Sequence, residues 1–144
     1  MSNEAPILLV EDEPDDQFFI VEAFRTNKVM VPIHVLNSAS EAIAYLRGEG
    51  KYADRTKFAL PRLIITDLKM AGGSGFTLLE YLKQERQWAG TPKIVLSASG
   101  DRDDIQTAYP LGANCYHKKP SSFAELCKLM KRLYDYWGIA SGRK

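Results

Sequence analysis

The stretch "LIITDLKMAGG", residues 63–73, begins like a buried strand, runs into an acid and ends in a pair of glycines. The apolar residues 63–65 and Thr66 suit a strand, and Asp67 follows them directly. An aspartate at such a place can simply stabilise a turn, because Asp is among the commonest turn residues. It can also lie at the carboxyl edge of a parallel sheet, where open α/β folds keep their chemistry. The segments on either side decide between these two interpretations.

Short β-rich runs alternate with segments of helical period along the whole chain. The expected strands cover residues 6–10, 32–37, 62–67, 92–99 and 113–120. The expected helices cover residues 14–28, 38–47, 75–87, 101–112 and 121–137. This alternation predicts an α/β fold, a doubly wound (βα)5 parallel sheet of five strands in the flavodoxin-like order 2-1-3-4-5. Because the crossovers are right-handed, all five strands should end along one edge of the sheet.

Local signals support several of the helix boundaries. Pro14 suits the first turn of the first helix, and either Ser38 or Ser40 can cap the second. Pro110 lies inside the fourth predicted helix, where it lacks the N–H that the last turn needs. We therefore predict a shortened or distorted fourth helix.

The composition is that of an ordinary single domain. The 144 residues carry a net charge of +1, from 19 basic and 18 acidic residues, which gives no electrostatic argument for nucleic-acid binding. The apolar runs are too short to cross a membrane, and the first residues lack the features of a signal peptide. Cys115 and Cys127 have no metal-site or CxxC spacing and are expected to be reduced. We expect a cytoplasmic protein in which residues 1–144 form one domain, with a core from about residue 5 to 137, a short C-terminal tail and no output domain.

Chemically active side chains gather at the predicted carboxyl ends of the strands. They are Glu11, Asp12 and Glu13 after the first strand, Asp67 after the third, Ser97 in the fourth, and Lys118, Lys119 and Pro120 at the end of the fifth. Clustered carboxylates repel one another, so they take up a proton or bind a cation, and oxygen ligands suit Mg²⁺. A carboxylate beside such a metal can act as a nucleophile toward a phosphoryl group. Ser97 and Lys119 can then bond the phosphoryl oxygens.

The motif order "LLVEDE … IITD … LSA … KKP" resembles the receiver domain of two-component response regulators over essentially the whole chain. The resemblance implies that Asp67 is the phosphoacceptor and a ligand of Mg²⁺. It implies that Glu11 and Asp12 form an acidic pocket in which Asp12 is a direct metal ligand, and that the backbone carbonyl of Lys69 is the third ligand. Such a protein is not an enzyme, although it would phosphorylate itself from small donors and lose the phosphoryl group again.

The same resemblance implies roles for residues around the phosphoryl group. Ser97 would be the switch hydroxyl and Lys119 the lysine that pairs with the phosphate. Tyr116 would be the switch aromatic, although its ring can also serve only to pack the core. The peptide bond between Lys119 and Pro120 would be cis. The side chain of Lys69 occupies a position that tunes phosphoryl lifetime in the family.

Segments outside the site are similar to those of one subgroup. The stretches "YLRGEGKYAD", "GANCYHKKPSSF" and "YDYWGIA" resemble the stand-alone regulators associated with bacterial and cyanobacterial phytochromes. This resemblance implies a cognate histidine kinase, such as a bacteriophytochrome. It also implies a homodimer formed through the fourth helix, the fifth strand and the fifth helix.

Other functions remain open from the residues alone. A pseudo-receiver would bind partners without phosphate. A Mg²⁺-dependent phosphatase with an aspartyl nucleophile would carry a second Asp where Lys69 stands, and a flavodoxin-like electron carrier would need a glycine- and hydroxyl-rich loop in place of the acidic segment 10–16. Glu13, Asp15 and Asp16 are expected to be no more than first-turn acids of a helix.

Overall fold

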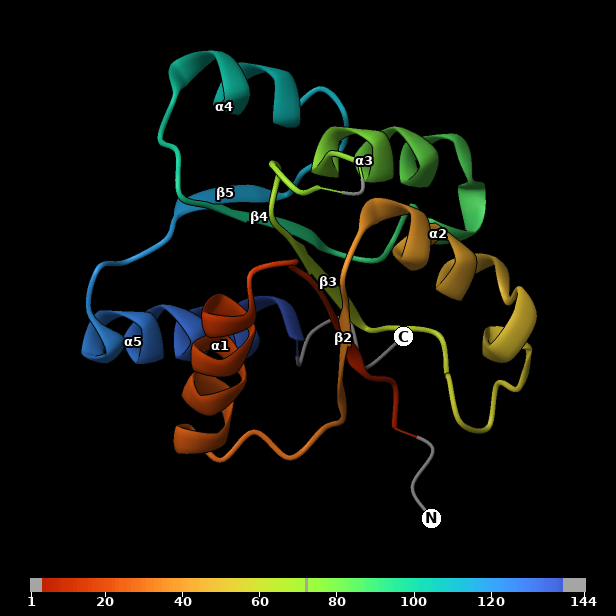
Figure 1. The fold of residues 1–144 in the computed structure, drawn as a ribbon, viewed down its shortest axis with the longest axis horizontal. Helices are drawn as coiled ribbons and strands as arrows, with labels where there is room; N and C mark the ends of the chain where they lie inside the picture. The colour runs from red at the N-terminus through yellow and green to blue at the C-terminus, as the bar shows by residue number, and fades with distance from the viewer. Residues whose placement is uncertain (1–3, 72, 139–144) are drawn as a thin grey trace.

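The computed structural model describes residues 4–71 and 73–138, which form a parallel sheet flanked by helices (Figure 1). The strands are β1 (Ile7–Val10), β2 (Ile33–Leu36), β3 (Leu63–Thr66), β4 (Lys93–Ser97) and β5 (Cys115–Lys118). Their order in the sheet is β2-β1-β3-β4-β5, and every pairing is parallel. The predicted fold class and strand order are confirmed.

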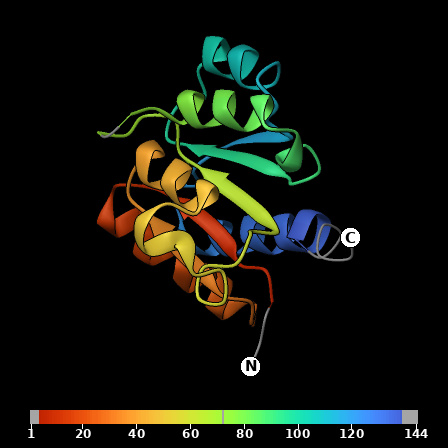
Figure 2. The same ribbon diagram turned by 90° about the vertical axis from the view of Figure 1, so that its right-hand side faces the viewer.

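Helices cover both faces of this sheet (Figure 2). They are α1 (Pro14–Thr26), α2 (Ala39–Arg47), α3 (Gly75–Gln84), α4 (Arg102–Ala108) and α5 (Phe123–Leu133). Short turns of 3-10 or π helix follow three of them, η1 (Gly50–Ala53), η2 (Arg86–Trp88) and η3 (Tyr134–Gly138). Helices α1 and α5 lie side by side on one face, and α2, α3 and α4 lie on the other (Figure 1).

The central strand β1 shows why the sheet needs both layers. Ile7 and Leu9 belong to the apolar cluster beneath α1 and α5, whereas Leu8 and Val10 belong to the cluster beneath α2 and α3. Neighbouring side chains on a strand point to opposite faces, so a continuous apolar run is buried only when helices cover both faces of the sheet. None of these four residues is more than 1% exposed. Each such burial contributes roughly 1.5–3 kcal/mol.

The local helix signals agree with the observed boundaries. Pro14 is the first residue of α1, and the side chain of Glu13 caps that helix by accepting bonds from two backbone N–H groups in its first turn. Ser38, rather than Ser40, caps α2 by accepting a bond from the backbone N–H of Glu41. Glu13 is therefore an N-cap, a more specific role than that of a first-turn acid.

Helix α4 is short, as Pro110 predicts. It ends at Ala108, and the backbone N–H of Leu111 turns back to the carbonyl of Ala108 at 3.1 Å. The N–H of Gly112 likewise bonds the carbonyl of Tyr109 at 3.0 Å. These are tightened turns, so the regular α-helical ladder does not continue through Leu111.

The long connection between α2 and β3 is an ordered insertion. Its residue Arg55 donates hydrogen bonds to the backbone carbonyls of Tyr45, Leu46 and Phe58 at 2.9–3.0 Å. Two of these carbonyls belong to the last turn of α2, where that of Tyr45 also accepts a bond from the N–H of Gly48 and that of Leu46 lies past the last intrahelical donor. An aromatic cluster packs beside this arginine and consists of His34, Tyr45, Tyr52 and Phe58. The sequence predicted only a polar connection here.

None of the helices in residues 4–71 and 73–138 has the length and apolar character needed to cross a bilayer.

Candidate functional site

Asp67 follows the last residue of β3 at the carboxyl edge of the sheet. Its backbone N–H donates to the carbonyl of Val10 on the neighbouring strand, at 3.0 Å. One carboxylate oxygen, Oδ1, accepts a bond from the N–H of Leu68 at 2.7 Å, and the other, Oδ2, lies 3.1 Å from Nζ of Lys119. The residue is only 8% exposed. Asp67 is thus a held, largely buried carboxylate with one oxygen facing a cation.

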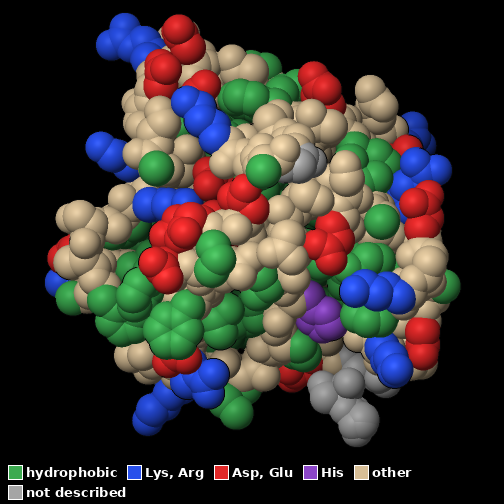
Figure 3. All heavy atoms as spheres, viewed as in Figure 1, with side chains coloured by type: hydrophobic (Ala, Val, Ile, Leu, Met, Phe, Trp, Pro, Cys, Tyr) green, Lys and Arg blue, Asp and Glu red, His purple; other side chains and the backbone are tan. Residues whose placement is uncertain are grey.

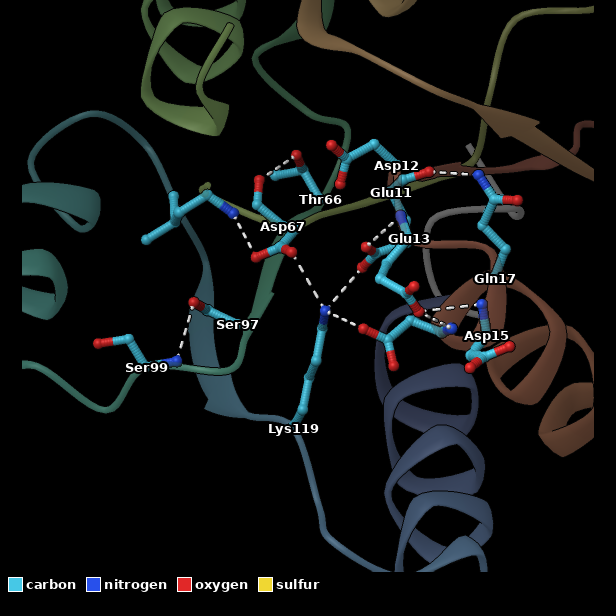
Figure 4. Close-up of polar contacts among 12 residues, drawn as sticks. Glu11, Asp12, Glu13, Asp15, Gln17, Thr66, Asp67, Ser97, Ser99 and Lys119 are labelled. Atoms are coloured by element: carbon cyan, nitrogen blue, oxygen red, sulfur yellow. Dashed lines mark hydrogen bonds and ion pairs between the residues drawn. The ribbon is translucent and has the colours of Figure 1, made fainter. Parts of the chain in front are cut away.

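Lys119 follows the end of β5 and reaches across the edge toward β1 and α1 (Figure 4). Its ammonium lies 2.8 Å from Oε1 of Glu11, 2.7 Å from Oδ2 of Asp16 and 3.1 Å from Oδ2 of Asp67. Burial alone would lower the pKa of Lys119, but the hydrogen bonds to Asp16 and Glu11 and the charge of Asp67 outweigh it and raise that pKa. The amine therefore stays charged at any physiological pH.

The acidic pocket is formed by the residues just after β1. Glu11 is 1% exposed, and its Oε2 accepts a bond from the N–H of Glu13 at 3.0 Å. Burial raises the pKa of Glu11, although Lys119 opposes the shift. The Oδ2 atom of Asp12 accepts a bond from the N–H of Ala71 at 2.8 Å. Asp12 therefore ties the β1 end to the loop between β3 and α3.

The oxygen atoms at this edge suit a hard divalent cation, which prefers carboxylates, carbonyls and water. Among the residues that the structure describes, no three carboxylate, imidazole or thiol groups are arranged to hold a metal by themselves. A cation here would rest on Asp12 and Asp67, with a backbone carbonyl such as that of Lys69 and waters completing its shell. The donor set therefore fits Mg²⁺, which keeps several waters and needs few protein ligands.

Ser97 ends β4 beside this pocket (Figure 4). It is 1% exposed, and its hydroxyl oxygen accepts a bond from the N–H of Ser99 at 3.2 Å. Its backbone carbonyl accepts a bond from the N–H of Lys119 at 2.7 Å. The ladder between β4 and β5 thus fixes the spacing between the hydroxyl and the lysine.

Tyr116 lies one strand over and is partly buried. Its hydroxyl donates to the backbone carbonyl of Ser99 at 2.7 Å, and its ring packs against the cluster that contains Val95 and Ala108. Burial raises the pKa of Tyr116. The residue therefore packs the core and also contacts the loop after Ser97, so its part in switching stays a prediction.

Exposed aromatic side chains border the site on the side of α1 and α5, where Figure 3 shows hydrophobic side chains gathered on the surface. Phe18 is 59% exposed, Phe19 45% and Phe123 42%. The ring centroids of Phe19 and Phe123 are 6.2 Å apart, so the two helices share one apolar patch. Apolar patches at a polar rim commonly mark protein-binding surfaces.

The sequence of this chain matches the response regulator receiver domain over residues 7–131, and the match includes Glu11, Asp12, Asp67, Ser97 and Lys119. The chain belongs to the response regulator receiver family. Receivers are modules of two-component signalling, and the recognition made from the four motifs is confirmed.

The relatives of this receiver include proteins associated with phytochromes. Response regulator Rcp1 of Synechocystis sp. is 30% identical over 131 residues, which cover 91% of this chain and 87% of Rcp1. The crystal structure of the phosphorylated cyanobacterial phytochrome response regulator RcpA matches with a TM-score of 0.85 and 34% identity, covering 93% of this chain and 94% of RcpA. The Mn²⁺-bound form of Rcp1 matches with a TM-score of 0.82 and 29% identity, covering 92% and 94%.

One predicted feature of the receiver is wrong. The peptide bond between Lys119 and Pro120 is trans, as are all peptide bonds in the described parts of the chain. The trans form is the more stable one by about 0.5–1 kcal/mol even before proline. With this trans backbone the ammonium of Lys119 lies 3.1 Å from Oδ2 of Asp67.

Asp16, Thr66 and Gly75 have roles at the site that the sequence patterns did not predict. Thr66 donates from its hydroxyl to the backbone carbonyl of Asp67 at 2.7 Å. A side chain on Gly75 would overlap that same carbonyl, because α3 begins directly against the backbone of Asp67. A glycine at the start of a helix is a signal that could have been used for Gly75. No local signal points to Asp16, which lies 103 residues from the lysine it binds.

Proposed function

We propose that this receiver accepts a phosphoryl group from a histidine kinase on Asp67, with Mg²⁺ bound, and passes the signal on through altered protein contacts. The observation that carries the proposal is the contact between Asp67 and the ammonium of Lys119 at a sheet edge that also presents Glu11, Asp12 and Ser97. A turn-stabilising aspartate would not need a partly buried lysine as its partner.

The residues divide the chemistry as follows. An oxygen of Asp67 attacks phosphorus while the donor leaves, and the fixed positions of Leu68 N–H and Lys119 hold the carboxylate still during the attack. Asp12, Asp67 and the carbonyl of Lys69 would hold Mg²⁺, with Glu11 in support. When bound, the metal neutralises charge on the phosphoryl oxygens. The ammonium of Lys119 stabilises the same charge from the opposite side.

The phosphoryl group would be read out through Ser97 and Tyr116. A phosphoryl oxygen near Ser97 would draw its hydroxyl inward and disturb the bond between Ser99 and Tyr116, so that the loop before α4 shifts. Such a modification biases an equilibrium between two arrangements that already exist. Small donors should phosphorylate Asp67 as well, and the acyl phosphate should hydrolyse without a partner enzyme.

The partners follow from the relatives and from the surface. A histidine kinase of the phytochrome type is the proposed donor, because Rcp1 and RcpA are similar over most of their length. The exposed patch of Phe18, Phe19 and Phe123 beside the site supports a protein donor.

We further propose a homodimer through α4, β5 and α5. An apolar hollow of about 510 Å³ beside β5 and α5, lined among others by Leu129 and Trp137, supports the part of this interface that those two elements form. No role for nucleic acid or membrane is proposed, and a cytoplasmic site of action fits such a kinase.

The test is intact-mass spectrometry after incubation with acetyl phosphate and Mg²⁺. We expect the mass of one phosphoryl group on the wild type, none on Asp67→Asn, and none when EDTA removes the metal. Asp15→Asn is the control, since Asp15 is an exposed acid near the same pocket, and it should be phosphorylated normally. If the wild type gains no mass with either the small donor or a phytochrome kinase, the proposal is wrong and the chain is a phosphate-independent binding module.

A further inference from the structure

Three carboxylates occupy the three N–H donors of the Lys119 ammonium. The shortest contact, 2.7 Å, is to Asp16 in the first turn of α1, and the longest, 3.1 Å, is to Asp67. Glu11 lies between them at 2.8 Å. The lysine is thus bound most closely by a residue outside the acidic pocket and outside the motifs that define the family.

The other two partners have further tasks in the proposed function. Glu11 supports the cation, and Asp67 becomes an acyl phosphate, which removes the charge of its carboxylate. Their bonds to the ammonium must therefore change during phosphorylation. Asp16 has no such task, because its side chain projects from α1 and is 38% exposed, compared with 2% for Glu11 and 9% for Asp67. Its bond to Lys119 can persist throughout.

We propose that Asp16 is a positioning residue that holds the Lys119 ammonium beside Asp67 while the other two bonds of that ammonium change. The inference rests on the proposed function. In the transfer, an oxygen of Asp67 forms a bond to phosphorus, the donor's bond to phosphorus breaks, and its electron pair leaves with the donor. Lys119 keeps its proton and only turns one N–H from the carboxylate of Asp67 to a phosphoryl oxygen.

Without Asp16, the ammonium keeps only its bonds to Glu11 and Asp67. Both of these bonds change during phosphorylation, so the ammonium is then no longer held where the incoming phosphoryl oxygens need it. In Asp16→Asn we therefore expect phosphorylation by acetyl phosphate to slow by about ten-fold, which is the scale of one lost charge-assisted hydrogen bond. Asp16→Glu restores the carboxylate and should regain most of the rate.

Asp15→Asn is the matched control for charge. It removes the same charge from the same turn of α1, and Asp15 is exposed and makes no ion pair with Lys119. A general electrostatic effect would slow both variants equally. A positioning effect should slow only the variant at Asp16.

The deciding experiment observes the lysine itself by ¹⁵N–¹H spectroscopy of the ammonium groups, in EDTA and without a donor. We expect one slowly exchanging ammonium signal that is absent in Lys119→Met, is retained in Asp15→Asn and exchanges roughly ten-fold faster in Asp16→Asn. An unchanged signal in Asp16→Asn, or equal changes in the two Asn variants, would overturn the inference. Because this readout needs neither phosphate nor metal, it gives an answer even if Asp67 proves not to be phosphorylated, which would sink the proposed function alone.

Discussion

Two positively charged side chains, those of Lys119 and Arg55, each contact three oxygen acceptors, but the acceptors are carboxylates in one case and backbone carbonyls in the other. Lys119 at the carboxyl edge of the sheet contacts the carboxylates of Glu11, Asp16 and Asp67. Arg55 in the insertion donates to three backbone carbonyls at the end of α2 and in its own loop. Carboxylates carry a charge that a proton, a metal ion or phosphorylation can neutralise, whereas amide carbonyls are uncharged and are neither protonated at physiological pH nor phosphorylated.

The difference separates a centre that can switch from one that cannot. Every bond of Lys119 is to a group whose charge can change, so its position is open to chemical control. The bonds of Arg55 are fixed by the backbone, and the planar guanidinium holds several carbonyls at once as an ammonium cannot. The comparison predicts that metal ions will affect one centre and leave the other unchanged.

The largest effect is expected for Lys119→Met. This change leaves three neighbouring carboxylates without their cation, and removing one partner of a buried ion pair typically costs about 3–5 kcal/mol. The free energy of unfolding in urea should fall by about that much in EDTA. Millimolar Mg²⁺ should restore much of the loss, because the ion binds the folded state and takes the place of the ammonium charge. A loss that Mg²⁺ does not reduce would mean that the carboxylates do not form a cation site.

A smaller loss, and one insensitive to metal, is expected for Arg55→Ala. The variant removes three hydrogen bonds and leaves the carbonyls of Leu46 and Phe58 without the donor that Arg55 supplies, at a cost of roughly 2–3 kcal/mol. Urea unfolding should show the same loss with Mg²⁺ and with EDTA, and phosphorylation of the folded protein should be normal.

Two further variants make this second prediction sharper. Arg47→Ala removes an exposed arginine whose guanidinium pairs with the exposed Glu49, and it should change stability by less than about 0.5 kcal/mol. Arg55→Lys should recover only part of the loss, because an ammonium lacks the planar fork. Full recovery of stability in Arg55→Lys would show that any positive charge can hold these carbonyls. The proposed difference between the guanidinium of Arg55 and the ammonium of Lys119 would then be wrong.

The sequence allowed the fold and most of the site to be predicted because both follow from local patterns. Alternating apolar runs define the strands, and the rule that parallel strands end at one edge brings Asp67 and Lys119 together. Pro110 predicted the short α4 because the backbone N–H that proline lacks is needed for the helical hydrogen bond at that same position.

The features that were missed depend on distances that no local pattern encodes. Asp16 contacts Lys119 only because α1 packs against α5, which brings the first turn of α1 beside the end of β5. Arg55 lies in a polar stretch of the sequence, and the contact that fixes it there is to the carbonyl of Leu46 at the end of α2. The bond before Pro120 was assigned as cis from family resemblance alone, and nothing in the local sequence required that isomer.

The smallest expected effect concerns pH and the aromatic cluster beside Arg55. Burial lowers the pKa of His34, whose ring packs edge-on against Tyr45 and Phe58. The imidazole of His34 therefore binds a proton more readily in the unfolded chain than in the folded one. The buried neutral ring contributes fully to stability above the ordinary pKa of 6.5, and this contribution is lost as the pH falls below that value.

His34→Phe should remove this part of the pH dependence, which we expect to amount to about 1–2 °C in Tm between pH 7.5 and 5.5. Burial and the charge of Arg132 also lower the pKa of His117, so His117→Gln gives the matched variant in which the contribution of His34 remains. Thermal unfolding of both single variants and of the double variant separates the two histidines. If the wild type and the double variant lose the same number of degrees, carboxylates alone set the acid sensitivity. The aromatic cluster that contains His34 would then be as insensitive to protons as Arg55 is to metal ions.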